Sequence, residues 1–127
     1  MIAKPQCVVL DCADVVELPR FYQSLLGGVV NQPDPRWSVG EGWATLHIDG
    51  GLVLAFQRVE GHRPPRWPEA VHPQQFHLDL GVKDLERAQE DVLKRGATQL
   101  TLINSGRTRL LSGPGYRRTG HHIRSAA

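Results

Sequence analysis

The sequence predicts an α+β domain in which one strand–helix–strand module is used twice. Residues 76–82 alternate apolar and polar side chains, as in a strand with one buried face, and a helical pattern that ends at Gly96 follows them. A shift of 70 residues aligns this stretch with the start of the chain: Cys7 lies on His77, Leu10 on Leu80, Asp14 on Asp84 and Leu18 on Ala88. Internal repetition at such a period is typical of one supersecondary unit that occurs more than once.

Length and composition favour one globular domain over residues 1–127. We expect a first module at about 5–60, a proline-rich connector at about 61–73 and a second module at about 74–127. No apolar run is long enough to span a membrane, and no signal peptide is visible, so we expect no membrane partner. Cys7 and Cys12 lie in one predicted strand at odd separation and should face opposite ways. Reduced thiols and a cytoplasmic location follow as expectations.

In the first module, residues 6–12 form the first predicted strand. Val8, Leu10 and Cys12 should lie on one face, with Cys7, Val9 and Asp11 on the other. Asp14 should cap a helix that ends at Gly27-Gly28, with Glu17 as a capping-box partner; Pro19 either begins its regular part or bends its first turn. Residues 43–48 and 52–57 predict a hairpin around Asp49-Gly50-Gly51, and residues 37–39 are a further short strand candidate.

In the second module, Asp84 should cap the helix and Gly96 should end it. Residues 99–103 and 108–111 are strand candidates, and residues 121–124 a weaker one. The tail from Ser105 is rich in Arg, Gly and His, and residues 104–127 hold five arginines and no acid. It is poor strand material with few aromatic residues, which favours a solvated terminus over a nucleic-acid partner. It should therefore leave a sheet edge uncovered.

The set of motifs resembles the vicinal oxygen chelate superfamily, and small bacterial glyoxalase-like and bleomycin-resistance-like domains in particular. The resemblance covers roughly residues 6–103. It rests on the duplicated module, on Asp-x6-Phe-Tyr-x3-Leu-Gly in the first helix and on the segments LAFQRV, PPRWP and HPQQFHLDL. It implies two βαβββ modules that form a curled mixed sheet with a half-open cavity, often completed by a second chain. We therefore expect a homodimer. The tail departs from the family pattern, whose closing turn matches either Gly113-Pro114 or Gly120-His121.

Metal-dependent members of that superfamily place four ligands on the first and fourth strands of each module. Carried over by position, these would be Cys7, Ala55, His77 and a residue near Arg124. Alanine and arginine offer no lone pair to a metal, so we expect no divalent metal and no cofactor. His77 is then more simply a partly buried imidazole that is hydrogen-bonded to a neighbour.

Two functions remain open from the sequence. The first is a metal-free protein that binds a small organic molecule in the sheet cavity, as the superfamily members that sequester drugs do. The second is a lyase- or isomerase-type enzyme in which His77 or Asp79 acts as the general base, with or without a metal. Trp37, Trp43 and Trp67 either wall a pocket or pack in the core. The predicted ligand-binding residues are Cys7, Val9, Asp11, Ala55, Gln57, His77 and Asp79.

Overall fold

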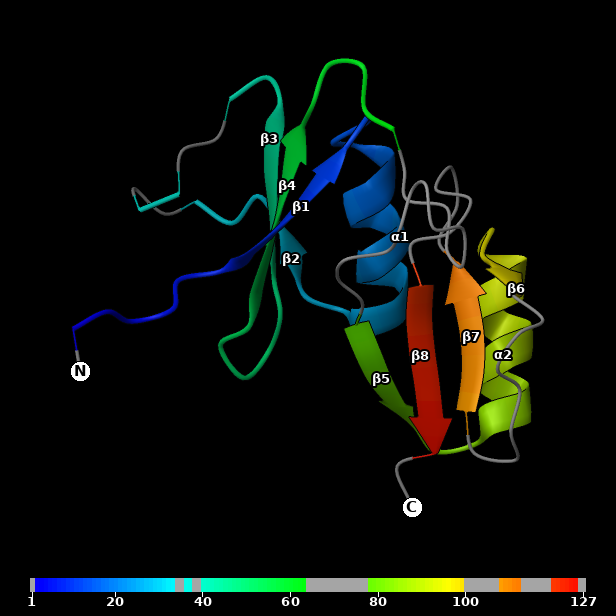
Figure 1. The fold of residues 1–127 in the computed structure, drawn as a ribbon. Helices are drawn as coiled ribbons and strands as arrows, with labels where there is room; N and C mark the ends of the chain where they lie inside the picture. The colour runs from blue at the N-terminus through cyan, green and yellow to red at the C-terminus, as the bar shows by residue number, and fades with distance from the viewer. Residues whose placement is uncertain are drawn as a thin grey trace. The chain divides into compact units, whose positions relative to one another are not determined.

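The computed structural model describes residues 2–33, 36–37, 40–63, 78–99, 108–112 and 120–125. The chain divides into two compact units, Met1–His62 and Arg63–Ala127 (Figure 1). The first unit contains β1 (Val8–Cys12), α1 (Glu17–Leu26), β2 (Val29–Val30), β3 (Trp43–His47) and β4 (Val53–Arg58). The second contains β5 (Leu78–Val82), α2 (Leu85–Lys94), β6 (Thr98–Gln99), β7 (Thr108–Ser112) and β8 (Gly120–Ser125).

The two units have the same topology. The strand order is β1-β4-β3-β2 in the first sheet and β5-β8-β7-β6 in the second. In both, the first and fourth strands are parallel neighbours, and the remaining pairs are antiparallel. The predicted α+β class and the two βαβββ modules are confirmed. The half-open cavity that the resemblance implies stays a prediction.

The core of the first unit lies between its sheet and α1. Along β1, Leu10 is half-buried and Cys12 is buried, whereas Val9 and Asp11 are exposed, so the predicted face assignment holds. The aromatic ring of Phe56 on β4 lies 5.8 Å from that of Tyr22 on α1, and both side chains are fully buried. Burial of such rings dominates the hydrophobic stabilisation of a small core.

The start of α1 is stabilised by Asp14, although the helix begins three residues later, at Glu17. The Oδ1 atom of Asp14 accepts the backbone N–H groups of Val16 (2.7 Å) and Glu17 (3.1 Å). These two bonds lower the pKa of the Asp14 carboxyl from its ordinary value. A lowered carboxyl pKa means that the stabilisation is present above the pKa of the unfolded chain and is lost as pH falls through the folded-state value. Pro19 lies in the first helical turn, where its missing N–H breaks no helical bond.

The start and end of α2 follow the sequence prediction. The carboxylate of Asp84 accepts the N–H of Arg87 at 3.1 Å. Gly96 has φ of 100°, which favours glycine, and its N–H donates to the carbonyl of Leu93 at 3.0 Å. The last turn also carries an ion pair of 3.1 Å between Lys94 and Glu90 on the exposed side. Neither helix in the described ranges has the length and apolar character needed to cross a bilayer.

One strand was missed, and two strand predictions need correction or fall partly outside the described residues. The short strand β2 was not predicted, and Trp37, which we expected to begin a strand, lies in a bend. Two residues are too few to show a period of two. β2 forms because Gly28 lets the chain pass directly against the carbonyl of His47, where an added Cβ atom would clash. Strand β6 covers Thr98–Gln99, and residues 100–103 of the predicted strand lie outside the described residues. Most of the predicted connector at 61–73 also lies outside them.

The tail provides the two strands that the sequence marked as candidates, at 108–111 and, more weakly, at 121–124: β7 covers Thr108–Ser112 and β8 covers Gly120–Ser125. β8 is an inner strand of the second sheet, parallel to β5 and antiparallel to β7. The prediction that a poor tail would leave this part of the sheet unpaired is therefore wrong. Backbone pairing on both sides of β8 outweighs the weak strand propensity of its residues, because that propensity depends strongly on context.

Candidate functional site

The face of the first sheet opposite α1 combines an apolar pair with a polar pair. Val9 on β1 is in register with Ala55 on β4, and Asp11 is in register with Gln57. Val9 is 43% exposed and Ala55 is fully buried, whereas Asp11 and Gln57 are both exposed. Four of the predicted ligand-binding residues therefore lie together. They form a face, called here the open face, on which the apolar Val9, the carboxylate of Asp11 and the amide of Gln57 are exposed and Ala55 is buried.

Strand β3 adds aromatic and hydroxyl groups to the open face, and sequence reasoning did not assign them. Trp43 is in register with Gln57, and Thr45 with Ala55. Asp11, Gln57 and Trp43 thus form one row across three strands. The Nε1 atom of Trp43 is buried and has no hydrogen-bond partner in the described part of the chain. The alternation in residues 43–48 indicated which face these side chains occupy, but not which residues of β4 they adjoin.

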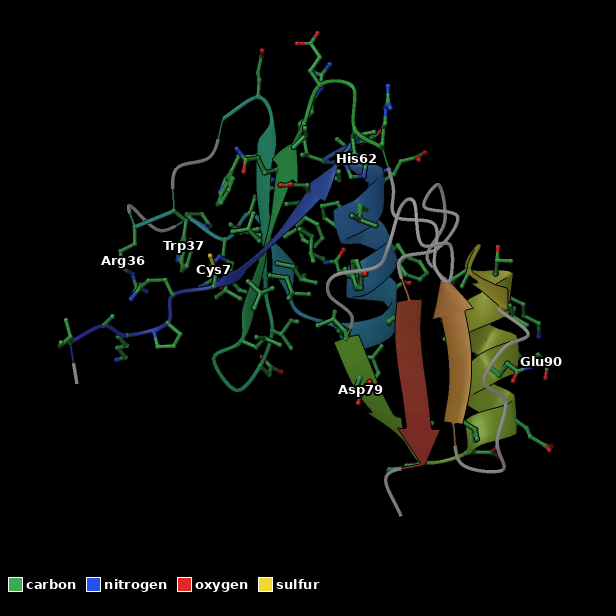
Figure 2. All side chains as sticks on the ribbon, in the orientation of Figure 1. Cys7, Arg36, Trp37, His62, Asp79 and Glu90 are labelled. Carbon is green, nitrogen blue, oxygen red and sulfur yellow. The ribbon has the colours of Figure 1, made fainter. Side chains whose placement is uncertain are left out.

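His47 and Trp37 close one end of the open face. The Nε2 atom of His47 lies 3.1 Å from the hydroxyl of Thr45. The ring of Trp37 stands edge-on to the imidazole of His47, with 5.6 Å between ring centroids. Figure 2 shows Trp37 and Cys7 on the same side of the first unit, near the start of β1. Trp37 therefore lies beside His47 at this end of the face, and a role in a pocket wall stays a prediction; Trp67 lies outside the described residues.

The corresponding positions of the second sheet carry ionisable residues. Asp79, labelled on β5 in Figure 2, is exposed and in register with His122 on β8. Gly81 is in register with Arg124. In the first sheet the same positions hold Val9 with Ala55 and Asp11 with Gln57. His77, the other predicted catalytic residue, falls outside the described residues.

This register corrects the fourth position that was carried over from the resemblance. Val9 and Asp79 are 70 residues apart, and Ala55 and His122 are 67 apart, since the second copy has shorter connections (79 − 9 = 70; 122 − 55 = 67). His122, not Arg124, therefore corresponds to Ala55. The sequence alone does not show that the stretch between the first and fourth strands is three residues shorter in the second module than in the first.

The described residues do not supply a complete metal site. Ala55 has no donor atom at the position where the superfamily's metal-dependent members place a ligand. No group of three His, Cys, Asp or Glu side chains in the described ranges lies close enough to hold a metal ion. The first unit thus offers a ligand an apolar and hydrogen-bonding surface and lacks one of the expected donors.

Comparison with known proteins identifies the family. The family model described as "Glyoxalase-like domain" matches residues 7–115, which is most of the chain. The chain belongs to the glyoxalase-like domain family. The predicted membership in the vicinal oxygen chelate superfamily is confirmed with it. No curated protein matches the sequence.

Solved structures of glyoxalase-like proteins share the fold at low identity. The fosfomycin resistance protein FosX from Mesorhizobium loti is 13% identical with a TM-score of 0.66, over 100% of this chain and 94% of that one. A glyoxalase/bleomycin resistance protein/dioxygenase family enzyme from Burkholderia phytofirmans PsJN is 16% identical with a TM-score of 0.67, over 96% and 98%. FosX from Listeria monocytogenes, complexed with Mn(II) and 1S,2S-dihydroxypropylphosphonic acid, is 13% identical with a TM-score of 0.68, over 100% and 93%. At these identities the likeness establishes the fold alone.

Proposed function

We propose that this glyoxalase-like protein binds a small organic molecule on the open face of its first sheet. One observation carries the proposal: the apolar Val9 is exposed, the exposed carboxylate of Asp11 and amide of Gln57 lie on the same face, and the buried Ala55 is in register with Val9. Binding sites for small molecules are mostly apolar, with few polar groups that fix orientation. The aromatic side chains of Trp37 and Trp43 suit a ligand that has a flat or apolar part.

We propose further that binding needs no divalent metal. Ala55 supports this, because a methyl group cannot replace the ligand that the superfamily's metal-dependent members use at its position. With His122 at the fourth position, the other three positions still carry the donor types Cys7, His77 and His122, so the support rests on Ala55 alone. Among the similar structures, FosX is a fosfomycin resistance protein, and another is a glyoxalase/bleomycin resistance protein/dioxygenase family enzyme. Sequestration of a drug or metabolite, without conversion, is the activity that this residue set favours.

A titration followed by nuclear magnetic resonance tests the proposal, with bleomycin and a panel of small aromatic acids as probes. We expect a binding probe to shift the amide signals of Val9, Asp11 and Gln57. Val9→Glu should weaken the binding of that probe at least tenfold, which corresponds to about 1.4 kcal/mol, because it replaces the exposed apolar side chain of the open face with a charged one. Val16→Glu is the matched control, since Val16 is a similarly exposed valine (54%) beside α1. Equal losses in the two variants, or shifts confined to α1 and its surroundings, would reject the open face as the site.

The second candidate is an enzyme of the lyase or isomerase type, with Asp79 as the general base. The observation that favours it is the exposed carboxylate of Asp79 beside His122 in the register of β5 and β8. A bound probe that is recovered unchanged supports the binding protein. Slow conversion that is lost in Asp79→Asn supports the enzyme.

Association into a homodimer remains a proposal. The predicted uncovered edge at the tail does not support a dimer, because β8 is paired on both sides. What supports it is that, among the described residues, β1 and β5 each have one hydrogen-bonded neighbour in their own sheet, and an edge strand of this kind can pair with another chain. Sedimentation at micromolar concentration tests it against the 14.1 kDa monomer. We also propose a cytoplasmic location, supported by Cys7 and Cys12, which form no disulfide.

A further inference from the structure

One end of the open face carries a row of hydrogen-bonding side chains on three strands. Asp11 on β1 is in register with Gln57 on β4, and Gln57 is in register with Trp43 on β3. Neighbouring strands lie about 4.8 Å apart, so adjacent members of the row are close enough to bind one small group together. The row contains an acceptor in the carboxylate, a donor and an acceptor in the amide, and a donor in the indole N–H.

The indole of Trp43 is a donor for which the described residues provide no acceptor. Its Nε1 atom is buried and has no hydrogen-bond partner in the described part of the chain, whereas the side chain as a whole is half-buried. A buried N–H group without an acceptor carries the free-energy cost of a lost hydrogen bond. A ligand that brings an acceptor removes this cost, so the Trp43 donor favours a ligand that carries one.

We propose that the ligand of the open face is a neutral planar amide, such as a lactam or an imide, that binds at this row. The ligand carbonyl has two lone pairs, which accept the Trp43 N–H and one N–H of the Gln57 amide. The ligand N–H donates to the Oε1 atom of Gln57. The apolar body of the ligand extends toward Val9, two residues before Asp11 on β1. This inference rests on the proposed function, because it names the class of ligand for the same face.

The charges at this end of the open face favour a neutral group over an anion. Asp11 is exposed in the same row, and its carboxylate repels a ligand carboxylate or phosphate. Arg58, the next residue of β4 after Gln57, is in register with Cys12 and therefore belongs to the opposite face of the sheet. Arg36 lies near Trp37, at the other end of the open face (Figure 2).

The side chain of Gln57 controls access to the Trp43 donor. Because Nε1 is buried, a ligand oxygen reaches it only when a neighbouring side chain changes rotamer. Gln57 is exposed and in register with Trp43, and exposed side chains change rotamer readily. The competing arrangement is one in which Gln57 turns and its own Oε1 atom accepts the Trp43 N–H, which leaves no donor for a ligand.

Gln57→Met distinguishes the two arrangements in the ligand-free full chain, because methionine keeps the length of the side chain and removes the amide. We expect the indole N–H proton signal of Trp43 to keep its position in this variant. An upfield shift of that signal, which is the change expected when an indole N–H loses an acceptor, would overturn the proposal.

Aromatic probes of similar shape test the ligand class in the full chain: 2-quinolone has a carbonyl and an N–H, 1-methyl-2-quinolone has the carbonyl alone, and naphthalene has neither. We expect 2-quinolone to bind at least tenfold more tightly than the other two, which corresponds to about 1.4 kcal/mol. It should also move the Trp43 indole N–H signal downfield. Quinoline-2-carboxylate, an anion, should bind more weakly than 2-quinolone.

Trp43→Phe keeps an aromatic ring and removes the donor. The ratio of the affinities for 2-quinolone and naphthalene should fall about fivefold in this variant, the usual effect of one hydrogen bond. The ratio cancels any loss of ring contact that both probes share. An unchanged ratio, no binding of 2-quinolone at millimolar concentration, or tighter binding of the anion would overturn the proposal. Equal affinities of the three uncharged probes, with shifts at Val9 and Gln57, would overturn the ligand class and leave the proposed function standing.

Discussion

Replacement of Phe56 by alanine should lower the free energy of unfolding by about 3–5 kcal/mol, the usual range for truncation of a buried phenylalanine. Phe56 is fully buried, and its ring packs 5.8 Å from that of Tyr22. The substitution therefore removes apolar area and leaves a cavity between β4 and α1. For a chain of 127 residues this is a large share of the total stability.

Gln57→Ala is the matched control for Phe56→Ala, because Gln57 is the next residue of β4 and points to the exposed side. Its effect should stay within about 0.5 kcal/mol. Denaturant unfolding of both variants measures the difference. Similar losses for the two would mean that the faces of β4 are assigned wrongly, and the open face with them.

Replacement of Gly28 by alanine should lower the free energy of unfolding by about 2–5 kcal/mol. Gly28 has φ of +93°, and a Cβ atom there would clash with the backbone carbonyl of His47. The left-handed backbone contributes about 1–2 kcal/mol of this cost, and the overlap with a rigid strand adds about 1–3 kcal/mol. The contact of β2 with β3 should be disturbed first.

Gly51→Ala separates these two contributions. Gly51 has the same φ of +93°, and nothing lies within 4 Å of the position of its missing Cβ atom. It should therefore cost only the backbone part, about 1–2 kcal/mol. Thermal and denaturant unfolding of the two variants compare them directly. A Gly51→Ala loss as large as that of Gly28→Ala would show that the close approach to His47 contributes nothing.

Much of the fold was predictable because local patterns agree with the tertiary structure. The alternation along β1, the cap at Asp84 and the helix end at Gly96 are each determined within a few residues. In the tail, the strands at 108–111 and 121–124 were predicted as candidates, but the pairing of β8 on both sides was not. β8 is held by backbone pairing with two strands that lie far from it in the sequence, and no pattern within residues 120–125 records those partners.

The sequence predicted which side of each strand the candidate-site residues occupy, but not which of them are neighbours across the strands. Alternation placed Val9 with Asp11, and Ala55 with Gln57, on the correct side of their strands. It could not pair Trp43 with Gln57, because antiparallel register depends on the turn between β3 and β4. Nor could it find His122, since the second module has shorter connections than the first and shifts the correspondence by three residues.

The metal content of the purified protein tests the central claim, binding without a metal, most directly. Elemental analysis after purification without chelators should find far less than one equivalent of zinc, nickel, iron or manganese per chain, because Ala55 removes one of the four ligands and leaves Cys7, His77 and His122 as the only donor types at the four positions. One tightly bound divalent metal per chain, lost in His77→Ala or in His122→Ala, would contradict the account.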